Sequence, residues 1–226
     1  FLGGWSQGGL NTTGFLERLE LAGIKVTGTF TASSPSDPYA ALNGLMYHPR
    51  KDMDAIWTNS IIALSTFSFQ FYYGNKSLAK EVINPTYYKD FRDIYFRNYR
   101  TPQKLEALFT KWAQTPLLKF FRPEYSNPSY FASSDYGRLL ANTETYRQQF
   151  KTPIRTYYGS NDEVIMETVG LLPSAYQGLL IGNSSSQSQN KIEAVKIDGG
   201  THRLTFISAA HAAKTWMDEL IHSVAK

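Results

Sequence analysis

The sequence predicts an α/β fold in which a mainly parallel sheet is interrupted by a long helical insertion. Both ends of the chain alternate short apolar or β-branched runs with amphipathic stripes of helical period, which is typical of a parallel sheet. Residues 37–150 differ, because they hold 24 of the 33 aromatic side chains (14 Phe, 15 Tyr and 4 Trp). We therefore expect residues 1–36 and 151–226 to form a core, and residues 37–150 a helical, aromatic-rich cap or lid.

The first expected strand covers residues 1–5, where an apolar run leads into a glycine-flanked turn. Residues 10–21 carry apolar side chains at helical spacing, and Gly23 is expected to end this helix. Residues 24–30 (IKVTGTF) are β-branched and alternating, which predicts a second strand. Residues 31–38 are rich in Ser and Pro and predict a loop.

The insertion is expected to be mostly helical, with helices separated by Asn-Pro and Thr-Pro pairs. Its three clearest helical stretches are residues 55–73, 87–99 and 103–114. Residues 66–73 (TFSFQFYY) also alternate partly as a strand would, so a strand is the alternative there.

After the insertion, residues 151–159 predict a third strand with Pro153 near its start, where a missing N–H is tolerated. Residues 163–176 predict a helix in which Pro173 lies late or breaks the helix. A polar loop, a fourth strand and a closing amphipathic helix complete the pattern, at residues 184–190, 191–197 and 204–224.

The composition is that of an ordinary globular protein. The 226 residues include 23 Lys and Arg against 19 Asp and Glu, with 42% hydrophobic and 19% charged residues, which excludes a disordered or collagen-like chain. No apolar run is long enough to predict a transmembrane segment, and no basic stripe with interleaved aromatics indicates a nucleic-acid partner. The lack of Cys excludes disulfides, thiolate metal sites and a cysteine nucleophile.

The chain opens inside what reads as a buried strand, with no initiator Met and no signal peptide. We therefore expect an N-terminal portion of the same protein, with further strands, to precede it. Plentiful Tyr, Asn, Ser and Thr, modest charge and no Cys favour a secreted or periplasmic protein.

A possible nucleophile lies directly after the first strand. Residues 4–8 (GWSQG) match G-x-S-x-G, in which a serine on a sharp strand-to-helix turn projects its hydroxyl from the strand end. Glycines on either side are expected to permit close backbone approach. Ser6 is the predicted nucleophile, and the alternative is an ordinary Gly/Ser turn.

A serine nucleophile needs a base and an orienting acid. His202 follows the last strand in a glycine loop (DGGTH). His48 lies in the helical insertion, and His211 and His222 lie on the closing helix, where a surface or packing role is expected. Asp162 follows the third strand in GSND and is the predicted acid, with helix capping as its alternative role.

The runner-up acids are Asp198 and Glu163. Asp198 is expected to lie too near its strand end to reach the imidazole of His202.

The order Ser6, Asp162, His202, each at a strand end, resembles the α/β-hydrolase superfamily, whose members carry the triad in that order. The resemblance covers residues 1–30 and 151–226, and the insertion is similar to the variable cap of that family. It implies a serine hydrolase that cleaves a carboxylic ester, or an amide, through an acyl-enzyme. An acyltransferase, a peptidase and a non-catalytic fragment or binding module remain alternatives.

The same resemblance suggests further site residues. The backbone N–H of Gln7 is expected to supply one oxyanion donor, and the second is expected to lie outside this chain. Trp5, Trp57 and Phe71 are candidates for contact with a small or medium apolar or aromatic substrate. No cofactor and no metal site are expected, because no metal cluster, P-loop or dinucleotide motif is present.

Overall fold

A computed structural model describes residues 1–50, 52–98, 101–183 and 192–224. The chain forms two compact units. The core unit comprises Phe1–Ala41 and Thr143–Lys226, and the inserted unit comprises Leu42–Asn142. These boundaries lie within a few residues of the change in aromatic content along the sequence.

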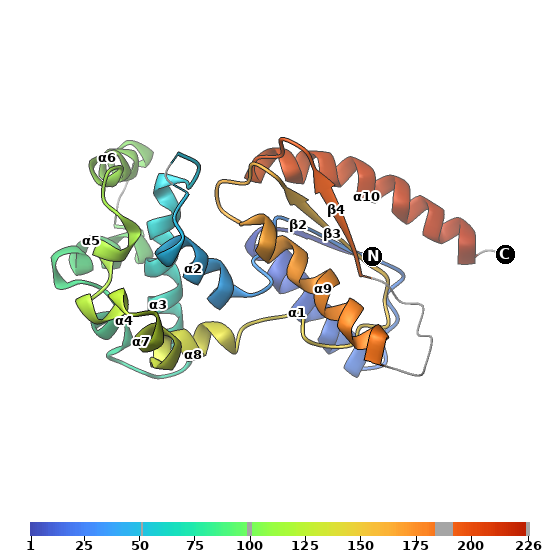
Figure 1. Ribbon diagram of the computed structural model, residues 1–226, viewed down its shortest axis with the longest axis horizontal. Helices are drawn as coiled ribbons and strands as arrows, with labels where there is room; N and C mark the ends of the chain where they lie inside the picture. Colours follow the sequence, from blue (N-terminus) through green and yellow to red (C-terminus); the bar gives the residue numbers. More distant parts are fainter. Residues whose placement is uncertain (51, 99–100, 184–191, 225–226) are drawn as a thin grey trace. The chain divides into compact units, whose positions relative to one another are not determined.

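In its described residues, the core unit is built on a parallel sheet of four strands in the order β1-β2-β3-β4 (Figure 1). The strands are β1 (Leu2–Trp5), β2 (Thr29–Ala32), β3 (Ile154–Gly159) and β4 (Ile192–Ile197). Every neighbouring pair is parallel, so the carboxyl ends of all four strands lie along one edge. Side chains that follow different strands can therefore meet at that edge.

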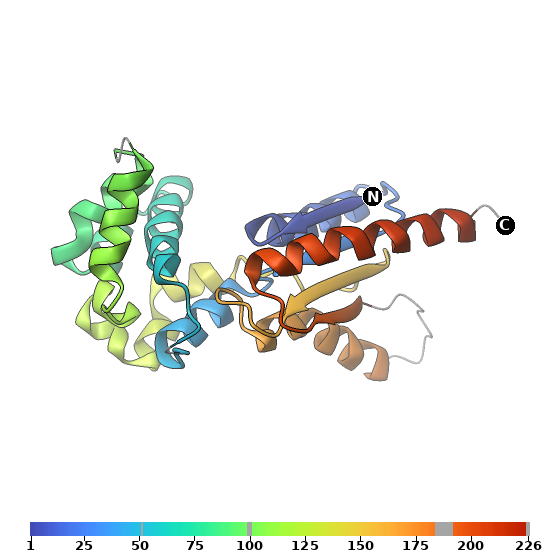
Figure 2. The ribbon, with the colours of Figure 1, turned by 90° about the horizontal axis from the view of Figure 1, so that it is seen from above.

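Helices cover both faces of this sheet. The helices α1 (Gln7–Leu21) and α9 (Glu167–Asn183) lie on one face, and α10 (His202–Val224) lies on the other (Figures 1 and 2). Alternate strand residues point to opposite faces, so Ile154 packs with Leu16 of α1, while Tyr157 packs with the alanines of α10. The sheet thus separates two apolar clusters, and its carboxyl edge stays free for polar side chains.

The predicted second strand is misplaced by several residues. The structure pairs only Thr29–Ala32 as β2, and residues 24–28 lie outside the sheet. Pairing starts late because the neighbours start there, with Leu2 of β1 and Ile154 of β3 both opposite Thr29. β-branched composition alone therefore does not set the strand's position.

Three helix starts in the core unit also differ from the sequence prediction. The helix α1 begins at Gln7 rather than residue 10. The helix α9 begins at Glu167 rather than residue 163, because the Asp162 carboxylate accepts the N–H groups of Val164 and Ile165 and holds that segment in a turn. Pro173 lies inside α9 and does not end it. The helix α10 begins two residues earlier than predicted, so His202 is its first residue rather than part of a loop.

The inserted unit is helical in its described residues. The first residues of the helix α2 (Pro38–Tyr47) belong to the core unit, and its residues from Leu42 onward belong to the inserted unit. The remaining helical segments are η1 (Ile56–Asn59), α3 (Ser60–Tyr72), α4 (Leu78–Val82), α5 (Pro85–Tyr95), α6 (Pro102–Trp112), η2 (Leu117–Phe120), η3 (Pro123–Ser126), α7 (Pro128–Ser133) and α8 (Asp135–Ala141).

The Asn-Pro pairs start helices in the way their chemistry favours. The Asn84 side chain accepts the N–H of Thr86, and the Asn127 side chain accepts the N–H of Ser129. In both helices proline occupies the first turn, where an N–H has no intrahelical acceptor to lose. These pairs therefore mark the starts of α5 and α7.

Aromatic side chains form much of the core of the inserted unit. Phe91, Trp112 and Phe120 are buried, and their ring centroids lie 5.1–5.5 Å apart. Tyr136 is fully buried and shares a 2.7 Å hydrogen bond with Ser65, and burial raises the pKa of its phenol. The aromatic enrichment of the sequence thus mainly fills this core.

The three predicted helices of the insertion are present as α3 with η1, α5 and α6. Residues 66–72 are helical, so the strand alternative for residues 66–73 is wrong. Tyr99, Lys191 and the predicted loop at residues 184–190 lie outside the described residues. None of the helices described combines the length and apolarity needed to cross a membrane.

Candidate active site

Ser6 lies on a sharp turn between β1 and α1. Its backbone has φ 55° and ψ −128°, a left-handed conformation that L-residues rarely adopt and that costs about 1–3 kcal/mol. The turn is held because the Ser6 N–H donates to the Ala32 carbonyl of β2 at 2.9 Å. The neighbouring strand therefore fixes where the Ser6 hydroxyl emerges.

The two glycines of the G-x-S-x-G motif play different parts. A Cβ on Gly4 would lie 2.2 Å from the Gly8 carbonyl oxygen, so the turn closes only with glycine at position 4. A Cβ on Gly8 would meet no atom of the described residues within 4 Å. The expectation of close backbone approach is confirmed for Gly4 and wrong for Gly8. Gly9 supplies the second close approach, because a Cβ there would lie 2.7 Å from the Ser34 side chain.

His202 reaches Ser6 from the other end of the chain. Its Nε2 lies 2.9 Å from Ser6 Oγ, and its side chain is only 6% exposed. The segment between β4 and α10 carries Gly199 at φ 70°, a conformation that favours glycine. This turn places the imidazole over the carboxyl end of β1.

Asp162 holds the other nitrogen of the imidazole. Its carboxylate oxygens lie 3.1 and 3.2 Å from His202 Nδ1. A carboxylate can only accept a hydrogen bond, so this pair favours the tautomer with the proton on Nδ1, which leaves Nε2 able to accept a proton from Ser6. The structure thus places Ser6, His202 and Asp162 in one hydrogen-bonded row.

The environment keeps Asp162 ionised although it is buried. Desolvation alone would raise the pKa of Asp162, but the hydrogen bond and charge of His202, the N–H of Ile165 and the nearby hydroxyl of Ser33 outweigh it and lower the pKa. By distance and angle, Ser33 Oγ makes no hydrogen bond within the described residues, so its contribution is smaller than that of His202. An ionised Asp162 can stabilise an imidazolium.

The other candidate acids and histidines lie elsewhere. Asp198 is 91% exposed beside Lys196, and Glu163 bonds to the backbone N–H of His202 rather than to its ring. His211 is exposed on α10 and contacts the carbonyl of Ile207. Two further exposed histidines are His48, in the inserted unit, and His222, near the end of α10.

Trp5 lies beside the imidazole. Its indole N–H donates to the His202 carbonyl at 3.0 Å, and its ring lies 5.1 Å from the imidazole and 5.2 Å from Phe206. Trp5 therefore contacts both the backbone and the ring of His202. In the sequence, the only feature that marked Trp5 was its position in the G-x-S-x-G motif.

Gln7 is the first residue of α1, so its backbone N–H has no acceptor inside the helix. This N–H adjoins Ser6 at the positive end of the helix dipole, where a developing negative charge is stabilised. The geometry is compatible with the oxyanion role expected for Gln7.

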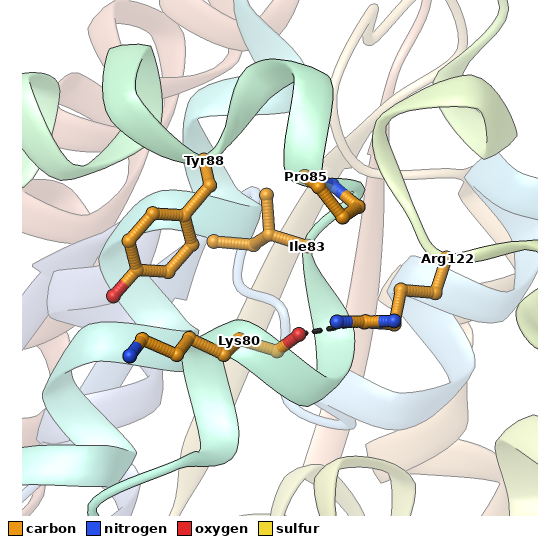
Figure 3. Close-up of a pocket in the computed structure, with 5 residues that line it drawn as sticks. All are labelled: Lys80, Ile83, Pro85, Tyr88 and Arg122. Atoms are coloured by element: carbon orange, nitrogen blue, oxygen red, sulfur yellow. Dashed lines mark hydrogen bonds between the residues drawn. The ribbon is translucent and has the colours of Figure 1, made fainter.

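Trp57 and Phe71 lie in the inserted unit, at 39% and 76% exposure. The inserted unit has a cavity that is lined by Lys80, Ile83, Pro85, Tyr88 and Arg122. There Arg122 Nε donates to the Lys80 carbonyl at 2.6 Å (Figure 3). Neither Trp57 nor Phe71 lines this cavity.

The described residues contain no cluster of three or more His, Cys, Asp or Glu side chains arranged to hold a metal ion. The sequence did not predict the contacts that Ser33 and Glu163 make near Asp162 and His202. Ser33 has φ 47° at the end of β2, and no sequence motif marks it. Glu163 stood out only as an alternative acid, because its contact to a backbone group leaves no trace in the sequence.

Comparison with known proteins supports the fold. A candidate hydrolase from Legionella pneumophila matches with TM-score 0.74 and 15% identity over 96% of this chain and 55% of that chain. The rice cell wall degrading esterase LipA from Xanthomonas oryzae matches with TM-score 0.70 and 16% identity, over 98% of this chain and 58% of that chain. No protein-family model and no curated protein matches the sequence.

This chain therefore spans a little more than half the length of the solved chains it resembles. At these identities the likeness establishes the fold, which is the α/β-hydrolase fold that the sequence predicts.

Proposed function

Starting from the α/β-hydrolase fold, we propose that this protein is a serine hydrolase that cleaves carboxylic esters. The observation that carries the proposal is the 2.9 Å contact between Ser6 Oγ and His202 Nε2, on a turn strained in the manner of a nucleophile elbow. Both solved relatives described above bear hydrolase or esterase names, which agrees with this chemistry.

The proposed reaction follows from the hydrogen-bonded row. Ser6 Oγ attacks the ester carbonyl while its proton passes to His202 Nε2, and Asp162 stabilises the resulting imidazolium. The carbonyl oxygen becomes an oxyanion facing the N–H of Gln7. The imidazolium then protonates the leaving alcohol, and an acyl-enzyme on Ser6 remains. Water, deprotonated by His202, releases the acid and regenerates Ser6.

Trp5, Trp57 and Phe71 are proposed to contact the apolar part of a small or medium substrate. Phe71 is 76% exposed, so truncating it to alanine is expected to leave stability within about 0.5 kcal/mol of the parent, whereas Trp57 is 39% exposed and its truncation is expected to cost more. If they bind substrate, KM rises while kcat changes little. An unchanged KM in both variants would remove them from the site.

The test is hydrolysis of a short-chain aryl ester such as 4-nitrophenyl butanoate by the full-length protein. Ser6→Ala and His202→Ala are expected to abolish turnover while the far-ultraviolet circular dichroism stays unchanged. His211→Ala, at an exposed histidine outside the row, is the matched control and is expected to retain activity. Full activity in Ser6→Ala would overturn the proposal.

Two other reactions use the same residues. In an acyltransferase, an alcohol or amine replaces water in the second step, and in a peptidase the scissile bond is an amide. Adding an acceptor alcohol and measuring the transfer product separates the first from hydrolysis. Comparing matched ester and amide substrates separates the second.

A further inference from the structure

The loop that carries Asp162 is bound directly to the segment that carries His202. The Ser160 N–H donates to the Ile197 carbonyl at 3.2 Å, and the Asn161 N–H donates to the Gly200 carbonyl at 3.1 Å. In return the Gly199 N–H donates to Ser160 Oγ at 2.8 Å. The two segments are therefore held together by several bonds before the triad itself is considered.

His202 is also held at its own peptide groups. Its backbone N–H donates to Glu163 Oε2 at 2.9 Å, and its carbonyl accepts the indole N–H of Trp5 at 3.0 Å. Its ring is held by Asp162, the residue before Glu163. Adjacent residues of one loop thus fix the backbone and the ring of the same histidine.

The Glu163 carboxylate accepts a backbone N–H at the start of α10. His202 is the first residue of this 23-residue helix, so its N–H has no intrahelical acceptor. A carboxylate at the positive end of a helix dipole is favourable, and a charged acceptor makes a stronger bond than a neutral one. Thr201 directly precedes α10, and its Oγ1 accepts the N–H of Leu204, while Glu163 accepts the N–H of His202.

We propose that Glu163 is a positioning residue that holds the backbone of His202 so that Nε2 faces Ser6. This inference rests on the proposed function for its catalytic consequence. Without Glu163 the first turn of α10 can shift, and the 2.9 Å contact between Nε2 and Ser6 Oγ lengthens. A misplacement of about 1 Å can cost about 100-fold in rate. The effect falls on kcat, because Glu163 acts through His202 rather than through the substrate.

The experiment compares Glu163→Ala and Glu163→Gln in the full-length protein. Alanine removes the acceptor, and kcat for the aryl ester is expected to fall by about 10- to 100-fold at unchanged KM. Glutamine keeps an acceptor oxygen without the charge, and kcat is expected to stay within about fivefold of the parent. Glu167→Ala is the matched control, because Glu167 pairs with the half-exposed Lys196 instead of the His202 backbone, and its kcat should match the parent.

A second measurement does not depend on turnover. The proton between His202 Nδ1 and Asp162 gives a low-field proton NMR resonance when the imidazole is held against the carboxylate. This resonance is expected in the parent, in Glu163→Gln and in Glu167→Ala, and to be lost or broadened in Glu163→Ala. Thermal unfolding of each variant shows whether the fold survives the substitution.

The outcomes separate the two proposals. If Glu163→Ala retains parental kcat and the resonance, or if Glu163→Gln is as impaired as Glu163→Ala, the positioning role is wrong. If the parent shows no Ser6-dependent turnover but the resonance follows the expected pattern, the hydrolase proposal fails and the positioning of His202 by Glu163 stands.

Discussion

Gly4→Ala is the substitution that tests the geometry of the Ser6 turn most sharply. The new Cβ would lie 2.2 Å from the Gly8 carbonyl oxygen and 2.4 Å from Thr12 Oγ1. The first of these is a backbone atom, so rotating a side chain cannot relieve the contact. Either β1 or the first turn of α1 must move, and Ser6 lies between them.

The cost follows from this contact. Forcing one extra carbon into a closed site destabilises a protein by about 1–3 kcal/mol. At about 2–4 °C per kcal/mol for a chain of this size, Tm is expected to fall by roughly 2–12 °C. Because Ser6 moves relative to His202, activity is expected to fall by about 100-fold as well.

Gly8→Ala is the matched control inside the same motif. A Cβ there meets no atom of the described residues within 4 Å, and Gly8 lies in the helix α1. Replacing glycine by alanine in a helix is expected to stabilise the fold by about 0.5–1 kcal/mol. Gly8→Ala should therefore raise Tm slightly and keep activity.

Thermal unfolding and ester hydrolysis of the two variants measure both effects. The reasoning is refuted if Gly4→Ala is as stable and as active as the parent. It is also refuted if the two variants lose stability equally, because the structure places a backbone atom against only one of them.

Three further predictions concern the residues around the imidazole. Ser6→Gly should be more stable than Ser6→Ala by about 1 kcal/mol in chemical denaturation, because glycine adopts φ 55° without strain; equal stabilities would contradict the strained turn. Asp162→Asn should lower kcat by about 10⁴-fold. Because the folded-state pKa of Asp162 lies below the ordinary 3.8, its charge contributes stability above about pH 4 that is lost as the pH falls through the lowered value. The difference in unfolding free energy between parent and Asp162→Asn should therefore shrink on acidification, and a constant difference would contradict this. Trp5→Phe keeps a ring beside Phe206 but loses the bond to the His202 carbonyl, so kcat should fall by roughly 2- to 10-fold; a change in KM alone would make Trp5 a substrate contact only.

The strand ends that carry the site could be predicted from the sequence. Gly-rich turns after apolar runs singled out Ser6 and Asp162 as candidates, and parallel strands bring their carboxyl ends to one edge whatever lies between them. The predicted bounds of β2 were wrong by several residues, but the candidate residues follow β1, β3 and β4 and do not depend on those bounds.

The supporting contacts could not be predicted, because they depend on distances across the fold. Glu163 and Trp5 contact the peptide of His202 across 39 and 197 positions in the chain. Every residue except proline has a backbone N–H and every residue has a backbone carbonyl. A contact to such a group therefore requires no particular residue type and produces no sequence motif. Position 4 requires glycine and position 8 does not, and this difference depends on which atoms a Cβ added at each position would meet.

The most direct test of the central proposal is covalent labelling of the full-length protein with a fluorophosphonate, followed by mass spectrometry. The proposed triad predicts one adduct on Ser6 and none on Ser6→Ala. It also predicts labelling slowed by orders of magnitude in His202→Ala. An unlabelled folded protein, or an adduct on another serine, would contradict the proposal that Ser6 is an activated nucleophile.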